Sequence, residues 1–538
     1  MIGADAIVKC LEKEGVTTLF GYPGVAICPF FNSILNTKTE TILVRSEQNA
    51  AHAASGYARV SGKVGVCVAT SGPGATNLIT GIATAYADSI PLVCITGQVD
   101  SHLLGSDVFQ EADITGAAES FVKYSYLIKE VSQIPRIMKE AFHIASTGRR
   151  GPVLIDIPID IQNMPISSFK YPESVSMRTY KPTVKGHAVQ IKKVAKELEH
   201  AKKPVILAGG GVILSGAQSE LRDFSHRYGI PVVSTMMGIS SFPSDDPLYF
   251  GMIGNNGRAH ANLAMRESDL LIVVGARIAD RAISSPDLVA KDTVLIHIDV
   301  DPAEIGKNVG PTIPIVGDIR AIFSELLKDS ADTDFTAWVE HLNTCRAKEK
   351  ARKSPRKGYV DPAKFITALT ERMDKNAVYV ADVGQNQMWS CAYYVSKAGR
   401  FLTSGGMGTM GYSIPAAIGA KRADMKRQVV AVCGDGSFQM SMNELATMQQ
   451  HKIPVKIIVF NNGYLGLVRE YQQNTYKGNY SMVSLDGSPD LEKIAAAYDI
   501  PFVRLAKSTG MEEVIAGFLK MKGPGLMEVI LDPMDTVK

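Results

Sequence analysis

Gln428-Val-Val-Ala-Val-Cys-Gly-Asp-Gly-Ser437 contains an unbroken apolar run that ends in an aspartate flanked by two glycines. A helical pattern follows over Met440–Gln450, and a second apolar run, Val455–Phe460, ends in Asn461-Asn462-Gly463. Apolar runs without alternation are typical of strands buried on both faces, and a helix between two such strands indicates a parallel sheet. The segment therefore predicts an α/β fold with polar groups at the ends of two neighbouring strands.

Asp435 and Asn462 stand at the ends of these two strands. Because the carboxyl ends of parallel strands emerge at one edge of a sheet, we expect the two side chains to converge there. A carboxylate and an amide oxygen suit Mg²⁺, which also takes oxygens from a diphosphate. Gly434 and Gly436 let the backbone approach phosphate, and the next helix offers its positive amino end. Gly-Asp-Gly alone is also a common turn, so this prediction depends on its combination with the Asn-Asn pair.

The same alternation of apolar runs and helical segments extends over the whole chain. It predicts α/β architecture with mainly parallel sheets flanked by helices. The predicted strands are Lys63–Thr70, Ile90–Gly97, Pro152–Ile157, Pro204–Ala208, Leu270–Gly275, Thr293–Val300, Ala377–Asp382, Gln428–Gly434, Val455–Asn461 and Gly525–Leu531.

Two stretches interrupt this alternation, the proline-rich Met164–Lys185 and the charged Ser330–Pro362. The second contains a basic run, Lys348–Lys357, which is either a solvated helix end or linker, or a patch that binds a partner. The interruptions predict three domains, at about 1–165, 186–328 and 360–538.

Composition excludes several classes of protein. The 538 residues include 57 Lys and Arg and 54 Asp and Glu, and the positive and negative residues are interspersed along the chain. We therefore expect no binding of nucleic acid. No apolar run approaches the roughly 20 residues that cross a bilayer, so we expect no membrane association. Seven cysteines without a CxxC pair, and an amino terminus without a signal-peptide core, favour a reduced cytoplasmic enzyme.

The spacing between Gly-Asp-Gly and Asn-Asn resembles the signature of thiamine diphosphate enzymes. The resemblance implies that Asp435 and Asn462 bind Mg²⁺, with the main-chain carbonyl of Tyr464 as the third protein ligand. Ser404–Gly411 resembles the loop that holds the cofactor's aminopyrimidine, and Asp382–Trp389 resembles the diphosphate loop. The cofactor-binding residues implied in this way are Gln385, Gly408, Met410, Asp435, Gly436, Ser437, Met440 and Asn462.

Thiamine chemistry also needs an acidic side chain that hydrogen-bonds a pyrimidine ring nitrogen of the cofactor. Glu47 is the candidate, because it follows an apolar strand and opens an alanine-rich helix. A simple role at the start of the helix is the alternative. The segment that follows this helix, which includes Thr70-Ser-Gly-Pro-Gly-Ala-Thr-Asn77, favours the catalytic role.

The chain resembles the catalytic subunits of acetohydroxyacid synthase (acetolactate synthase) over essentially its whole length. The resemblance rests on these motifs together with Phe20–Gly24, Gly105–Asp113, Gly151–Pro158 and Asp299–Glu304. The resemblance implies a three-domain fold in which the glutamate domain of one subunit faces the diphosphate domain of another, in a homodimer or homotetramer. It also implies decarboxylation of pyruvate and its ligation to a second 2-oxo acid, giving 2-acetolactate or a homologue, in branched-chain amino-acid biosynthesis. Whether a separate regulatory subunit joins the catalytic subunit stays open.

The family holds FAD against its middle domain. The positions of this chain that match the flavin site are Arg149, Gly209, Gly210, Gly211, Arg277, Asp299 and Asp318. By the same resemblance the substrate pocket is lined by Val25, Phe109, Gln110, Arg281 and Tyr471, with Arg281 pairing with the carboxylate of the acceptor.

Several positions near the substrate depart from the family pattern. Val25 replaces a glycine, Asn255 and Asn256 replace a Met-His pair, and Tyr471 replaces a tryptophan that selects the larger acceptor. Ser46 and Asn49 replace the usual His and Gly around the glutamate, and the usual closing tail is not expected after Lys538. Donor and acceptor identity and FAD retention are therefore open. The alternatives are a related thiamine diphosphate decarboxylase or carboligase and a catalytically silent scaffold.

Overall fold

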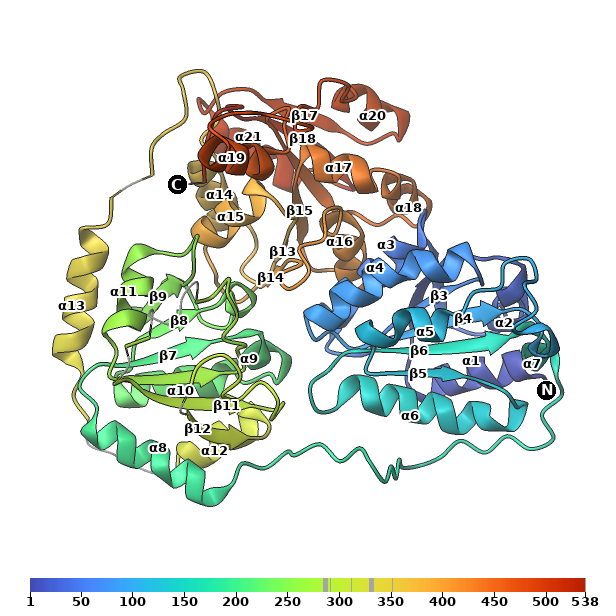
Figure 1. Cartoon of the computed structure of the whole chain (residues 1–538). Coiled ribbons are helices and arrows are strands. Elements are labelled where there is room, and N and C mark those ends of the chain that lie inside the picture. The colour runs from blue at the N-terminus through green and yellow to red at the C-terminus, as the bar shows by residue number, and fades with distance from the viewer. Residues whose placement is uncertain (284–288, 291, 311, 329–332, 351, 538) are drawn as a thin grey trace.

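The computed structural model describes residues 1–283, 289–290, 292–310, 312–328, 333–350 and 352–537. These residues form three six-stranded sheets, each wholly parallel and flanked by helices (Figure 1). The predicted α/β class with parallel sheets is confirmed. Each of the ten predicted strands is present, with ends shifted by at most two residues.

The N-terminal sheet has the order β2 (Glu40–Leu43), β1 (Thr18–Gly21), β3 (Gly65–Ala69), β4 (Leu92–Gln98), β6 (Pro152–Pro158), β5 (Tyr124–Leu127). Its helices are α1 (Gly3–Lys13), α2 (Cys28–Ile34), α3 (Glu47–Ser61), α4 (Pro73–Ala87), α5 (Ile114–Ala118), α6 (Ile134–Ser146) and α7 (Ile159–Asn163).

The middle sheet has the order β12 (Thr312–Val316), β11 (Val294–Asp299), β10 (Leu270–Val274), β7 (Pro204–Ala208), β8 (Val232–Ser234), β9 (Tyr249–Met252). Its helices are α8 (Ala188–His200), α9 (Gly210–Leu214), α10 (Gln218–Tyr228), α11 (Ala259–Glu267), α12 (Ile319–Leu326) and, at the outer edge, α13 (Thr336–Ala347) (Figure 1).

The C-terminal sheet has the order β14 (Arg400–Leu402), β13 (Val378–Ala381), β15 (Val429–Gly434), β16 (Lys456–Asn461), β18 (Gly525–Ile530), β17 (Phe502–Leu505). Its helices are α14 (Pro362–Arg372), α15 (Gln385–Tyr393), α16 (Ser413–Ala423), α17 (Asp435–Ser441), α18 (Glu444–Gln450), α19 (Gly466–Thr475), α20 (Leu491–Ala497) and α21 (Met511–Lys520).

One prediction about local structure was wrong. The helix expected over Met440–Gln450 is two helices, α17 and α18, and the first begins at Asp435 itself. Gly436 and Ser437 are weak helix formers, which hid this start in the sequence. An aspartate in the first turn of a helix is nevertheless favoured by the helix dipole.

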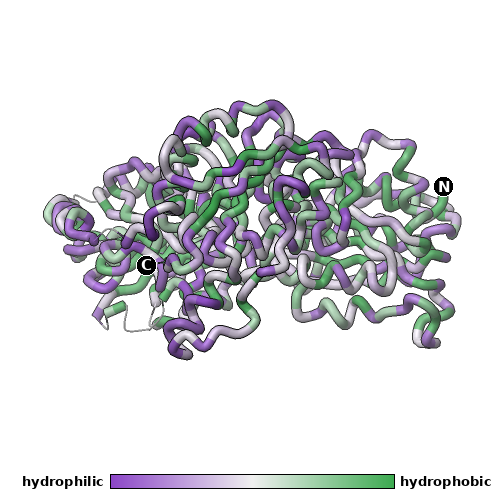
Figure 2. Tube along the Cα trace, turned by 90° about the horizontal axis from the view of Figure 1, so that it is seen from above, coloured by the Kyte–Doolittle hydropathy of each residue, from purple (hydrophilic) through white to green (hydrophobic). Residues whose placement is uncertain are grey.

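The N-terminal and C-terminal domains share one hydrophobic core, in which α3 crosses α16. The two backbones approach so closely that a Cβ atom on Gly56 would overlap the carbonyl of Ala416, and one on Gly419 would overlap the carbonyl of Ala53. The middle domain has a separate core. Apolar segments run through the interior in Figure 2, with hydrophilic segments around them.

The two predicted interruptions connect the domains. The first runs from α7 to α8 along the outside of the molecule (Figure 1). In the second, Arg352 pairs with Asp361 and Asp535, and Arg356 pairs with Asp532. These two arginines of the basic run therefore anchor the linker to the C-terminal domain. Within the described residues, no helix combines the length and the apolar character needed to span a membrane.

Candidate functional site

Three polar residues follow three adjacent strands of the C-terminal sheet, Asp382 after β13, Asp435 after β15 and Asn462 after β16. Asp435 is 4% exposed, and its carboxylate accepts hydrogen bonds from the backbone N–H groups of Gly463 (2.8 Å) and Gly436 (3.0 Å). Burial raises the pKa of Asp435 to about 6, although these hydrogen bonds oppose the rise. A bound cation would favour the ionised form, so this carboxylate suits a metal site.

Asn462 precedes Gly463, whose N–H donates to the Asp435 carboxylate, so the ends of the two strands lie together. Oδ1 of Asn462 accepts a hydrogen bond from the N–H of Tyr464 (3.0 Å), and its Nδ2 donates to Oε1 of Gln385 (3.1 Å). Gly436 and the buried Ser437, whose hydroxyl is 3.5 Å from the Val383 carbonyl, complete this edge. One carboxylate, one amide and main-chain oxygens fit Mg²⁺ that is shared with a diphosphate. No cluster of three or more His, Cys, Asp or Glu side chains suited to a metal occurs in the described ranges.

The loop Ser404–Gly411 lies against the same edge. Asp382 accepts hydrogen bonds from the N–H groups of Gly411 (3.0 Å) and Ser413 (2.8 Å), so a fully buried carboxylate fixes the end of the loop. Gly408 has φ +71°, a backbone conformation that favours glycine. A Cβ atom on Gly436 would lie 3.6 Å from Cε of Met410, and one on Gly411 would lie 3.2 Å from Cβ of Met440. The structure thus brings the predicted loop residues next to the Gly-Asp-Gly turn.

The start of this loop is held by the N-terminal domain of the same chain, which the sequence did not indicate. The buried carboxylate of Asp88 accepts hydrogen bonds from the N–H groups of Gly406 (2.7 Å) and Gly405 (3.3 Å). Arg59 donates to the carbonyl of Thr403 (2.7 Å) and pairs with Asp88 (3.5 Å). The contacts of Asp88 and Arg59 with the loop segment join residues more than 300 positions apart, so no local pattern could have revealed them.

Glu47 is the first residue of α3, at the carboxyl edge of the N-terminal sheet. Its carboxylate is half-buried and accepts a hydrogen bond from Nδ2 of Asn77 (3.0 Å) in α4. A Cβ atom on Gly74 would lie 3.3 Å from Oε1 of Glu47, and the buried hydroxyl of Thr70, also beside Gly74, has no hydrogen-bond partner among the described residues. The glutamate therefore lies among polar groups at a helix start.

Three predicted substrate residues and one predicted cofactor residue, Met440, are exposed in the single chain. Val25, Phe109, Met440 and Tyr471 are 76%, 87%, 58% and 59% exposed. They belong to both halves of the predicted site, with Val25 and Phe109 in the N-terminal domain and Met440 and Tyr471 in the C-terminal domain. Among described residues, no hydrogen bond joins Glu47 to Asp435 or Asn462.

Two other predicted substrate residues lie in loops. Gln110 has φ +61° and contacts the position of Gly72. Arg281 is exposed, and a Cβ atom on Gly408 would lie 3.7 Å from its Nη2. The structure therefore brings Arg281 to the cofactor loop of its own chain. The turn that carries Asn255 and Asn256 is adjacent, because a Cβ atom on Gly254 would overlap the carbonyl of Arg281.

The predicted flavin residues have other roles in this structure. Gly209 and Gly211 pack against Gly275, and their N–H groups donate to the carbonyls of Val274 and Gly275, respectively. The carboxylate of Asp318 caps α12 by accepting a hydrogen bond from the N–H of Ala321. Arg277 donates to the carbonyl of Ala87 (2.5 Å), Arg149 pairs with Glu304 (2.9 Å), and Asp299 accepts from the N–H of Asp301 (2.9 Å). Gly210 lies against Met237. These contacts do not test FAD binding, which stays a prediction.

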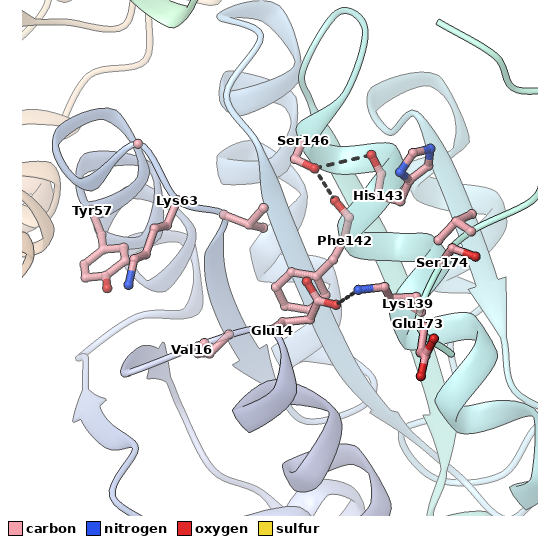
Figure 3. Close-up of a pocket in the computed structure, with 14 residues that line it drawn as sticks. Glu14, Val16, Tyr57, Lys63, Lys139, Phe142, His143, Ser146, Glu173 and Ser174 are labelled. Atoms are coloured by element: carbon pink, nitrogen blue, oxygen red, sulfur yellow. Dashed lines mark hydrogen bonds and ion pairs between the residues drawn. The ribbon is translucent and has the colours of Figure 1, made fainter. Parts of the chain in front are cut away.

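A groove of about 460 Å³ lies on the N-terminal domain, away from all the predicted site residues (Figure 3). Its lining includes Lys63, His143 and Glu173, and Lys139 pairs there with Glu14 (2.7 Å). None of the lining residues is a predicted site residue, so we do not assign the groove to the site.

Comparison with known proteins agrees with this geometry. Residues 1–117, 191–326 and 382–529 match, respectively, the N-terminal TPP binding domain, the central domain and the C-terminal TPP binding domain of the thiamine pyrophosphate enzymes. The chain is 44% identical to the probable acetolactate synthase large subunit of Methanocaldococcus jannaschii, over 100% of this chain and 93% of that one.

Two bacterial proteins are similarly related. The acetolactate synthase large subunit of Haemophilus influenzae is 43% identical, over 97% of this chain and 92% of its own length. That of Lactococcus lactis is 42% identical, over 99% and 93%. The chain belongs to the thiamine pyrophosphate enzyme family, among the acetolactate synthase large subunits.

Proposed function

We propose that this chain decarboxylates pyruvate and joins the resulting two-carbon unit to a second 2-oxo acid, giving 2-acetolactate or a homologue. The observation that carries the proposal is the edge of the C-terminal sheet, where the buried carboxylate of Asp435 accepts a hydrogen bond from the N–H of Gly463, the residue after Asn462. Full-length similarity to acetolactate synthase large subunits supports the same activity.

Thiamine diphosphate, when bound, supplies the thiazolium that accepts the electrons released by decarboxylation. Asp435, Asn462 and the carbonyl of Tyr464 would hold Mg²⁺, and Gln385, Gly436 and Ser437 would hold the diphosphate end. Gly408 and Met410 would present main-chain groups to the pyrimidine, with Met440 beside them. Glu47 would hold a proton at a pyrimidine nitrogen, as its position at the start of α3 permits.

A second copy of the chain would complete the site. Val25 and Phe109 on one domain and Met440 on another are exposed apolar side chains that frame the predicted pocket. Glu47 of one subunit would then serve the cofactor held by the other subunit, in a homodimer or homotetramer. Sedimentation of the holoenzyme tests this arrangement, and full activity in a monomer would contradict it.

Arg281 is the residue that we assign to the carboxylate of the acceptor. Its exposed guanidinium reaches the cofactor loop at Gly408, and a guanidinium fork matches a carboxylate in two hydrogen bonds. Val25, Phe109, Gln110 and Tyr471 would line the rest of the pocket. The adjacent Asn255 and Asn256 make this surface more polar than the Met-His pair of the family, which favours, as a second candidate, a related carboligase with a different donor or acceptor.

The test is a product assay with purified protein, thiamine diphosphate, Mg²⁺, and pyruvate with or without 2-oxobutyrate. We expect 2-acetolactate from pyruvate alone and a mixed product with both. An apolar pocket distinguishes acceptors that differ by one methylene by only about 1–3 kcal/mol, so loss of the tryptophan should weaken that preference. Consumption of neither 2-oxo acid as acceptor would contradict the assignment and favour the second candidate.

Three further properties need their own tests. The absorption spectrum of the purified protein shows whether FAD is bound. Co-purification from the native source shows whether a separate regulatory subunit joins. Fractionation tests a cytoplasmic location, which the seven free cysteines favour.

A further inference from the structure

The segment that leads into Glu47 is supported by a helix from the other end of the chain. β2 is an edge strand of the N-terminal sheet, so one side of its backbone has no neighbouring strand. Val44 donates inward, to the carbonyl of Gly21 (3.3 Å). The backbone groups that face outward, on Leu43 and Arg45, must find partners elsewhere.

Side chains of α18 and its flanking residues provide these partners. The N–H of Leu43 donates to Nε2 of His451 (3.0 Å), and the N–H of Arg45 donates to Oε1 of Glu444 (2.8 Å). Nδ2 of Asn443 donates to the carbonyl of Arg45 (3.4 Å). The contacts occur at alternate residues of the segment, as a neighbouring strand would make them.

Glu444 is the centre of this brace. It is 0% exposed, and its carboxylate also accepts hydrogen bonds from Nδ2 of Asn49 (2.9 Å) and the hydroxyl of Thr447 (2.6 Å). Hydrogen bonds to a buried carboxylate are among the stronger ones in proteins. Glu444 thus binds the backbone two residues before Glu47 and the side chain two residues after it.

The residue before α3 gives no comparable support. Ser46, the residue before the helix, makes no side-chain capping hydrogen bond. Asn49, one of the departures from the family pattern, is 3% exposed and directs its amide to Glu444. That departure therefore adds a donor to the brace in this chain.

We propose that Glu444 is a positioning residue for Glu47 and that Asn49 strengthens its hold. The proposal rests on the proposed catalytic role of Glu47. α18 follows α17 closely, and α17 begins at the metal-binding Asp435. One helical pair therefore carries a metal ligand at one end and the support of the catalytic glutamate at the other.

The test compares Glu444→Ala with the isosteric Glu444→Gln in the holoenzyme. The readout is the rate at which bound thiamine diphosphate exchanges its thiazolium C2 proton with D₂O, which depends on Glu47 and needs no substrate. We expect Glu444→Ala to slow this exchange about 10–100-fold. Glu444→Gln keeps an acceptor at Oε1 and should come within about fivefold of wild type.

Two measurements separate positioning from a loss of structure. Cofactor affinity, followed by quenching of the two tryptophans, should stay within about threefold in Glu444→Ala, because the diphosphate residues are untouched. Hydrogen exchange of the Arg45 amide should rise in the protein without cofactor. Gln450→Ala is the matched control on the same helix, because among the described residues Gln450 accepts a hydrogen bond from the guanidinium of Arg45 (2.6 Å) and not from the Arg45 backbone, so it should change neither readout.

Asn49→Ala tests the brace if Glu444→Ala fails to fold, and we expect C2 exchange to slow about 2–5-fold. Unchanged C2 exchange in both Glu444→Ala and Asn49→Ala overturns the proposal, as does a loss of cofactor affinity parallel to the loss of exchange. If wild type makes no 2-acetolactate but exchanges the C2 proton, the proposed function fails and this test still stands.

Discussion

The N-terminal and C-terminal sheets have the same topology and different chemistry. If strands are numbered within each sheet, both have the order 2-1-3-4-6-5 and are wholly parallel. The middle sheet has a different order, 3-2-1-4-5-6 from its other edge. In the C-terminal sheet, acidic residues follow the first and third strands, Asp382 and Asp435. In the N-terminal sheet, the third strand leads into Thr70–Gly74, and the only acid that we assign, Glu47, follows the second strand.

The difference shows that the topology fixes where loops emerge, while the residues in those loops decide what they bind. Asp435 is 4% exposed beside backbone N–H groups, which suits a metal and a diphosphate. Glu47 is half-buried beside the amide of Asn77, which suits a neutral ring nitrogen. On the proposed function, one topology would thus supply cofactor binding in one domain and proton handling in the other.

Glu47→Gln should break this division most strongly. The amide cannot hold a proton at the cofactor, so we expect turnover to fall by about 10²–10⁴-fold. Cofactor affinity, measured by tryptophan quenching, should stay within about threefold, because the C-terminal residues are intact. Glu40→Gln, in the same strand-helix unit, is the control and should leave turnover unchanged. Near-normal turnover in Glu47→Gln would remove the catalytic role of this residue.

Asp435→Asn tests the other sheet. The two carboxylate oxygens of Asp435 accept separately from Gly436 and Gly463; the amide keeps one of these acceptors and loses the charge, so we expect half-saturating thiamine diphosphate to rise by about 100-fold. Titration at several Mg²⁺ concentrations measures the change. The exposed Asp486→Asn is the control. An unchanged Mg²⁺ dependence in Asp435→Asn would place the metal elsewhere.

The sequence predicted most of the central strands of the three described sheets and none of their edge strands. Ten strands were found because unbroken apolar runs identify them. Edge strands such as β2, β5 and β9 are short and mixed in burial, so they carry no such signal. Asp435 and Asn462 were predictable because strands in sequence are neighbours in space. Glu444 was not, because its contacts with Arg45 and Asn49 link positions about 400 residues apart, and such pairing is a tertiary property.

Gly56→Ala tests how the two sheets are joined. The added Cβ atom would overlap the carbonyl of Ala416 where α3 crosses α16, and overpacking of this kind costs about 1–3 kcal/mol. The apparent Tm, followed by circular dichroism, should fall. Gly517→Ala is the matched control, because Gly517 lies inside helix α21 with nothing within 4 Å of an added Cβ, and it should stabilise by about 0.5–1 kcal/mol. An equal response of the two variants would contradict the close packing.

His451 gives the smallest expected effect and a sensitive test of the contact between β2 and α18. Its Nε2 accepts a hydrogen bond from Leu43, so the ring must be neutral. Burial, and then the charges of Arg422 and Arg45, lower its pKa. Arg422 itself pairs with Glu40, and Glu444 is the first residue of α18, the helix that His451 follows.

A histidine whose folded pKa lies below its unfolded value of about 6.5 binds fewer protons when folded, so stability is present above pH 6.5 and is lost as the pH falls below it. Burial raises the pKa of Glu444, which acts in the opposite direction at lower pH. The difference between wild type and His451→Gln removes that background, because Gln accepts from Leu43 without titrating. We expect the apparent Tm of wild type to fall more than that of the variant between pH 7 and 5.5. The corresponding difference in unfolding free energy should be at most that of one hydrogen bond, about 1 kcal/mol. Parallel curves would show that His451 does not couple the two domains to pH.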